Sequence, residues 1–170
     1  MATKSNFTPH EWQQILDSVT ITGMAVAYAD MSFLGLPKEM TACFREAMAA
    51  KDDPGASALV KAVSADFKGS PLISEQVKSR FGIGRVGADD TSSAEMRVEA
   101  IEALSELSSL LERKAPHEAR AFKTWLLCIA EKVAEASKEG GFLGIGGVRV
   151  SEAEKATLAE ISRALGLRGA

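Results

Sequence analysis

Residues 140–154 read GGFLGIGGVRVSEAE, a glycine-rich apolar loop that runs directly into a helix start. Ser151 and Glu154 have the spacing of a capping box, in which a hydroxyl and a carboxylate bond the free backbone amides of the first helical turn. A shorter version, SFLGLPKE at residues 32–39, occurs near the beginning of the chain. Each stretch follows a helix rich in small residues, so the sequence predicts two helix-loop-helix units.

The two units share residues as well as order. One constant shift of the numbering places residues 33–35 (Phe-Leu-Gly) on residues 142–144, and it also places Ala25 on Ala134. Chance similarity between alanine-rich helices is the alternative to a true repeat. A repeat would explain a bundle in which each helix pair buries the face that the other pair leaves exposed.

The first helix has the clearest boundaries. Thr8 can cap it, Pro9 fits its first position, and Glu11 completes a capping box. Residues at three- and four-residue steps then predict one buried stripe up to about Asp30; they are Trp12, Ile15, Leu16, Val19, Thr22 and Val26. The β-branched run 19–22 could also form a short strand, but a helix is the preferred interpretation.

Turn signals and periodicity predict the remaining helices. They are expected after Pro37 up to Asp52, over residues 56–67 and 72–81, from Ser93 as cap to Lys114, from His117 to Gly140, and from Ser151 to Gly166. The predicted fold is all-α, a compact bundle of about six or seven helices in a single domain, residues 1–170. Its two halves would be residues 8–67 and 93–167, joined by a hinge at residues 82–92.

The composition fits a globular helical domain. Of the 170 residues, 46% are hydrophobic but only 6% are aromatic, so aliphatic side chains have to fill the core. A chain of this length buries enough surface to fold without a metal or a disulfide. The net charge of −3 and the lack of any basic run argue against nucleic-acid binding, which depends on clustered Lys and Arg.

Sorting signals and cysteines favour a cytoplasmic protein. Residues 1–6 lack an apolar export segment, and no apolar stretch is long enough to span a membrane. Cys43 and Cys128 each lie in an apolar helical pattern, which predicts two reduced, buried thiols rather than a disulfide.

No residue pattern predicts a metal site or a cofactor. His10 and His117 lie at the starts of different helices, and neither has a neighbouring Cys or His. The acidic pairs at residues 52–53 and 89–90 lack the spacing of a calcium loop, so they are interpreted as turns or helix caps.

No catalytic signature is found either, so a non-enzymatic role is preferred, although any two of the 23 acidic residues could meet in space as an acid-base pair. It has no Gly-x-Ser-x-Gly motif, and the glutamates between residues 95 and 106 are typical of a solvated helix face. The glycine loop could bind an anion at the following helix start, but Glu152 and Glu154 would repel it.

The glycine loop is the predicted contact surface for a protein partner. An exposed apolar tip can enter a groove on a partner or touch a membrane surface. The residues predicted to bind are Phe142, Leu143, Ile145, Val148 and Arg149, joined by Phe33 and Leu34 if both loops lie at one end. We therefore expect a non-enzymatic interaction or adaptor module. The alternatives are a loop pinned onto the bundle, and a small-molecule or metal-ion sensor that uses the bundle interior or the acidic turns. An enzyme is the third alternative, which a polar cleft containing a carboxylate with a shifted pKa would favour.

The last third of the chain resembles the tellurite-resistance TerB-like domain. The resemblance rests on Ala134, Ala136 and Glu139, on the pair Ser151 and Glu154, and on LAEISRALGL at residues 158–167. The family usually has an Asp-Gly pair before its second helix, where this chain has Asp30-Met31 and Glu139-Gly140. The resemblance implies an all-helical bundle, cytoplasmic or membrane-associated, with no established enzymatic activity and a link to metal-stress and phage-defence systems in bacteria.

Overall fold

The computed structural model describes residues 2–29, 36–67, 73–83, 93–137 and 151–167. Within these ranges the chain forms seven α-helices and one short 3-10 helix, and it contains no strand. The elements are η1 (Lys4–Asn6), α1 (Pro9–Ala27), α2 (Leu36–Ala49), α3 (Ala58–Asp66), α4 (Glu75–Phe81), α5 (Ser93–Lys114), α6 (Pro116–Ser137) and α7 (Glu152–Ala164). The prediction of an all-α bundle is confirmed.

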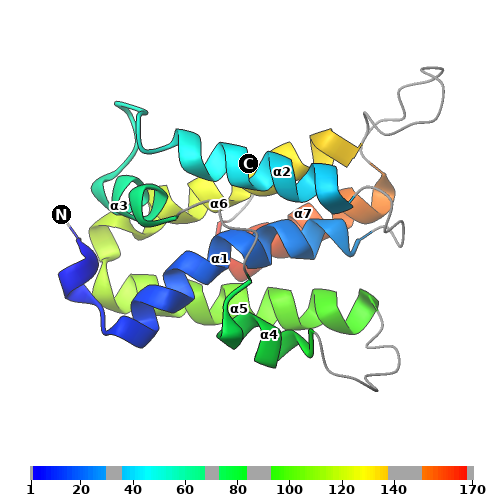
Figure 1. Cartoon of the computed structure of the whole chain (residues 1–170), viewed down its shortest axis with the longest axis horizontal. Coiled ribbons are helices and arrows are strands. Elements are labelled where there is room, and N and C mark those ends of the chain that lie inside the picture. Colours follow the sequence, from blue (N-terminus) through cyan, green and yellow to red (C-terminus); the bar gives the residue numbers. More distant parts are fainter. Residues whose placement is uncertain (1, 30–35, 68–72, 84–92, 138–150, 168–170) are drawn as a thin grey trace.

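Helix α1 lies at the centre of the bundle. It contacts α2, α5 and α6 along much of its length, and it also contacts α3 and α7. Figure 1 shows α1 between α2 and α5. Every residue from Asp17 to Val26 is buried, so this part of the helix has no solvent-facing side. The only charged residue in that run is Asp17, as expected for a helix surrounded by other helices.

All seven helices contribute to one hydrophobic core. Its largest fully buried side chains include Ile15 of α1, Leu104 of α5, Phe122 of α6 and Ile161 of α7. The core joins the two predicted halves, because α1 packs against both α5 and α6.

Helix starts follow local capping chemistry. Thr8 Oγ1 accepts a hydrogen bond from Glu11 N at 3.2 Å, and Glu11 Oε2 accepts one from Thr8 N at 2.8 Å. Ser151 and Glu154 form the same reciprocal pair at 3.1 and 2.7 Å. Gly166 follows α7 with a φ of 68°, a left-handed conformation that favours glycine. Both predicted capping boxes and the glycine stop are confirmed, and residues 19–22 are helical.

Several predicted helix starts are wrong in detail, among them those of α3, α4 and α5. Helix α5 begins with Ser93, so this residue belongs to the helix and does not cap it. Helix α4 begins at Glu75 instead of residue 72, because Ser74 Oγ accepts a hydrogen bond from Val77 N at 3.1 Å and caps the helix there. Residues 84–92, most of the predicted hinge, lie outside the described residues.

The prediction of two buried thiols is correct for Cys43 and wrong for Cys128. The buried positions of α6 include Leu126, Ile129 and Val133, and Cys128 falls on the other side of the helix. Cys43 is fully buried, and burial raises the pKa of its thiol to about 12.

Helices α1 and α2 approach each other closely at Gly23. A Cβ at this position would lie 2.9 Å from Cys43 Sγ and 3.2 Å from Cys43 Cβ, closer than real side chains pack. The thiol also donates a hydrogen bond to Val19 O at 3.3 Å. Cys43 therefore fills the space that the missing side chain of Gly23 leaves.

Glu118, at the start of α6, forms hydrogen bonds with the N-terminal segment and with the start of α3. Its Oε1 accepts a hydrogen bond from Ala2 N at 3.3 Å, and its Oε2 accepts one from Leu59 N at 3.2 Å. Burial by itself raises the pKa of Glu118, but the hydrogen bonds from Leu59, Ser57 and Ala2 outweigh it, so the pKa lies below its ordinary value. The carboxylate acts as an additional cap on the first turn of α3.

Candidate functional site

Five helix ends gather at one end of the bundle. The C-terminal ends of α1 and α6 and the N-terminal ends of α2, α5 and α7 lie together at one end of the long axis, at the right of Figure 1. We call this the loop end and define it by the terminal residues Ala27, Leu36, Ser93, Ser137 and Glu152. The opposite end carries α3 and the junction of α5 with α6.

The residues predicted to bind a partner lie outside the described residues: Phe33, Leu34, Phe142, Leu143, Ile145, Val148 and Arg149. Their flanking helices are described. Ala27 and Leu36 flank the first stretch, and Ser137 and Glu152 flank the second. All four flanking residues belong to the loop end.

The described surface has one large, exposed apolar side chain near the loop end. Val98, in the second turn of α5, is 53% exposed. Met48 is the other large apolar side chain that is exposed among the described residues, and it lies in the last turn of α2 towards the opposite end.

A cleft lies between α1, α4 and α5, and we call it the α4 cleft. It has a volume of about 190 Å³. Its apolar lining consists of Ile21, Val77, Ala103, Leu104 and Leu107, and its polar lining consists of His10, Gln14, Asp17, Ser18, Gln76, Arg80 and Glu106. A concave lining that combines apolar side chains with polar groups able to orient a ligand is a feature of small-molecule sites.

Asp17 is the most deeply buried carboxylate of the α4 cleft. The residue is 8% exposed. Its Oδ1 accepts a hydrogen bond from Gln13 Nε2, and its Oδ2 accepts one from Ser74 Oγ, both at 2.8 Å. Desolvation raises the pKa of Asp17, and the two hydrogen bonds only partly offset this effect. Neither of its partners carries a positive charge.

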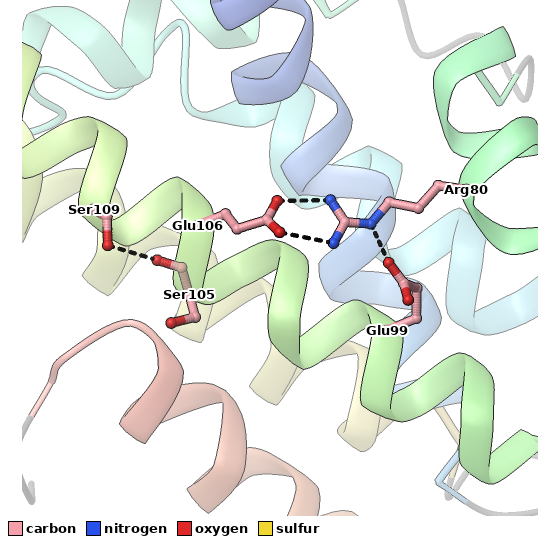
Figure 2. Close-up of polar contacts among 5 residues, drawn as sticks. All are labelled: Arg80, Glu99, Ser105, Glu106 and Ser109. Carbon is pink, nitrogen blue, oxygen red and sulfur yellow. Dashed lines mark hydrogen bonds and ion pairs between the residues drawn. The ribbon is translucent and has the colours of Figure 1, made fainter.

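Arg80 of α4 forms an ion-pair network across the cleft to α5. Its two terminal nitrogens bind both oxygens of Glu106, at 2.7 and 3.2 Å, and its Nε binds Glu99. Figure 2 shows the guanidinium held between these two carboxylates, with Ser105 and Ser109 close to Glu106 on α5. The hydrogen bonds to Glu106 raise the pKa of Arg80, and they lower that of Glu106. The predicted solvated face of α5 is therefore partly occupied by α4.

A second, wider hollow surrounds Lys123 between α5, α6 and α7. The residue is 3% exposed, and its Nζ binds Glu112 Oε1 at 2.5 Å. The charge of Lys123 is thus already paired, and the Glu112 pKa is lowered by this contact.

The histidines and the first acidic pair considered as metal ligands do not converge on one another. His10 and His117 are exposed, and Asp53 Oδ1 accepts a hydrogen bond from Gly55 N at 2.8 Å within a turn. No three His, Cys, Asp or Glu side chains come together to hold a metal ion within the described ranges. Over the same residues, no helix combines the length and the apolar character needed to cross a bilayer.

Asp17, Arg80 and Glu118 are functional candidates that only the structure reveals. For Asp17 a signal was present, because it is the last charge before a long, weakly polar helical run that has to be buried on all sides. Arg80 and Glu118 lie in short-range patterns that also suit exposed residues, and nothing local distinguishes them.

Comparison with known proteins does not add a family. No family model, no curated protein and no solved structure matches the chain. The resemblance to the TerB-like domain therefore stays a prediction, and the candidate sites rest on the geometry of this chain.

Proposed function

We propose that the protein is a non-enzymatic interaction module that binds a protein partner through its loop end. The observation that carries the proposal is the gathering of five helix ends, which flank both apolar stretches singled out in the sequence. Residues 33–35 and 141–148 contain no acidic residue and several large apolar ones. Exposed Val98 lies near the same end.

The length of the connection from α6 to α7 supports this proposal. The chain from Ser137 to Glu152 is longer than the roughly 2–8 residues that usually join helices in a bundle. Long connections in compact domains commonly carry binding residues on a rigid scaffold. By contrast, only Ala115 separates α5 from α6 at the opposite end.

The resemblance to the TerB-like domain adds a cellular setting to the proposal. It suggests a partner in bacterial cytoplasm that belongs to a tellurite response or another stress response. Partners identified through the loop end would test this suggestion directly.

The experiment replaces Leu143 and Ile145 together by Ser and compares partner capture by quantitative cross-linking mass spectrometry. Met48→Ser, an exposed apolar residue towards the opposite end, is the matched control. We expect the double variant to lose the partner and the control to keep it, and each melting temperature to stay within about 2 °C of wild type. A candidate partner must then bind the purified wild-type chain directly.

Two results would refute the proposal. The double variant could retain the same partners, which would exclude the loop as the contact. Alternatively, its melting temperature could fall by about 6 °C or more, as expected when core side chains are lost; residues 143 and 145 would then be part of the packed bundle.

Small-molecule sensing is the second candidate function, and the α4 cleft is the observation that favours it. A cavity of about 190 Å³ between three helices has the shape and lining that a small ligand needs. The metal-ion version of this function gains no support from the described residues, where no cluster of metal-ligating side chains occurs.

A further inference from the structure

The α4 cleft contains a buried carboxylate without a positively charged partner. Asp17 accepts hydrogen bonds from neutral groups alone, Gln13 Nε2 and Ser74 Oγ. Within the described ranges, no Lys, Arg or His side chain forms an ion pair with it. Burying a carboxylate costs free energy unless a cation or several donors compensate, so the site stabilises any positive charge that can reach it.

The one guanidinium of the cleft does not supply this charge. Arg80 is bound by Glu106 and by Glu99, so its single positive charge is paired with two negative charges (Figure 2). With Asp17 ionised, the cleft and its rim carry a net negative charge. An anionic ligand would be repelled, whereas a cation is attracted to the one carboxylate that has no countercharge.

The size and floor of the cleft define the rest of the ligand. An engineered apolar cavity of about 150 Å³ binds benzene, so about 190 Å³ suits a molecule of about six to ten non-hydrogen atoms. Ile21, Leu104 and Leu107 provide apolar contact for a ring or a hydrocarbon chain. This lining favours an organic cation over a hydrated metal ion, which needs more oxygen ligands than Asp17 can supply.

We propose that the α4 cleft binds a small organic amine, with its ammonium group paired to Asp17 and its hydrocarbon part on the apolar floor between α1 and α5. The inference rests on the second candidate function, small-molecule sensing, and names its ligand class. It does not depend on the loop end.

The test titrates the full chain with three probes of similar shape and different charge: benzylamine, benzyl alcohol and benzoate. Binding is followed by two-dimensional NMR of the backbone amides. We expect saturable shifts for benzylamine at residues of α1, α4 and α5 that line the cleft. Benzyl alcohol should bind about tenfold more weakly or worse, because it lacks the charged hydrogen bond, and benzoate weakest of all.

Two variants locate the effect. Asp17→Asn should remove the preference for the amine, so that benzylamine and benzyl alcohol bind equally, whereas the exposed control Asp52→Asn should leave it unchanged. Ala103→Leu extends a side chain into the cavity and should weaken both probes. Far-UV circular dichroism verifies folding, and the wild-type probe series decides the question even if a variant does not fold.

The outcomes test two things separately, whether the α4 cleft binds small molecules and whether it prefers an amine. If benzyl alcohol or benzoate binds in the cleft as tightly as benzylamine, the amine class is wrong while the small-molecule site stands. If no probe produces saturable shifts, or the shifts map to the hollow around Lys123, the proposed site is wrong and small-molecule sensing through the α4 cleft falls with it.

Discussion

Replacing Glu118 by Gln should destabilise the bundle measurably, although the side chain keeps its size. In the wild type, both carboxylate oxygens accept backbone hydrogen bonds, one from Ala2 N at 3.3 Å and one from Leu59 N at 3.2 Å. The Gln side chain offers one acceptor oxygen and turns its NH2 group towards the other amide. One buried donor is therefore left without an acceptor, and the remaining bond loses its charge.

The expected cost can be worked from these two bonds. A buried donor without an acceptor costs about 1–3 kcal/mol, and a hydrogen bond to a charged group contributes about 1.5–3 kcal/mol. Both distances are at the long end of the normal range, so we expect a loss near the lower bound, about 2 kcal/mol. For a chain of 170 residues this corresponds to a fall in melting temperature of about 4–8 °C.

The loss should also depend on pH. The folded-state pKa of Glu118 lies below its ordinary value, so the carboxylate contributes stability above the unfolded pKa and loses it as the pH falls through the folded pKa. The difference between wild type and Glu118→Gln should therefore be complete at neutral pH and shrink below the ordinary carboxyl range.

Urea denaturation followed by tryptophan fluorescence measures the effect, because Trp12 on α1 and Trp125 on α6 pack into or against the core. Glu135→Gln on the same helix is the control; it removes the charge of an exposed side chain that pairs with Lys132, and it should cost less than about 0.5 kcal/mol. A free energy of unfolding for Glu118→Gln within about 0.5 kcal/mol of wild type, a change typical of an ordinary surface position, would contradict the role given to this carboxylate.

Three further predictions concern the interior and α4. Gly23→Ala should lower the free energy of unfolding by about 1–2 kcal/mol, because overpacking against Cys43 outweighs the gain in helix propensity. Adding Cys43→Ala should restore most of this loss, as measured by urea denaturation in a double-mutant cycle. Burial raises the folded-state pKa of Asp17, so between the unfolded and folded pKa values the folded chain binds more protons than the unfolded chain. The free energy of unfolding should therefore fall as the pH rises through that window. Asp17→Asn should flatten this part of the pH-stability profile. Arg80→Met should change global stability by less than about 1 kcal/mol but speed hydrogen exchange of the α4 amides. Unchanged exchange would show that buried Val77 and Phe81, with the hydrogen bond from Ser74 to Asp17, hold α4 in place without the ion pair.

Local chemistry made much of the fold predictable. The capping boxes at Thr8 and Ser151 involve residues three positions apart, so the sequence reveals them directly. Helical periodicity likewise identified buried positions of α1 such as Trp12, Ile15 and Val19, because the spacing of side chains on one face is fixed by the helix itself. The prediction of a single buried stripe was wrong for residues 17–26, which are buried on all sides.

The site could not be predicted in the same way, since its contacts join distant positions. Asp17 meets Ser74 across 57 positions, and Arg80 meets Glu106 across 26. Such partners depend on how the helices are arranged, and each carboxylate looks like any other in the sequence. The same holds for the loop end, because the positions of five helix ends relative to one another follow from tertiary packing alone.

Because α1 and α2 pack closely at Gly23, the two cysteines of the chain differ in how their reactivity depends on separation of this helix pair. An alkylating reagent can reach exposed Cys128 in the native molecule, but it can attack Cys43 only after the two helices have separated and the thiol has met water. The ratio of the two modification rates, read by mass spectrometry from a single sample, would therefore measure how often this helix pair parts under native conditions. No engineered label is required.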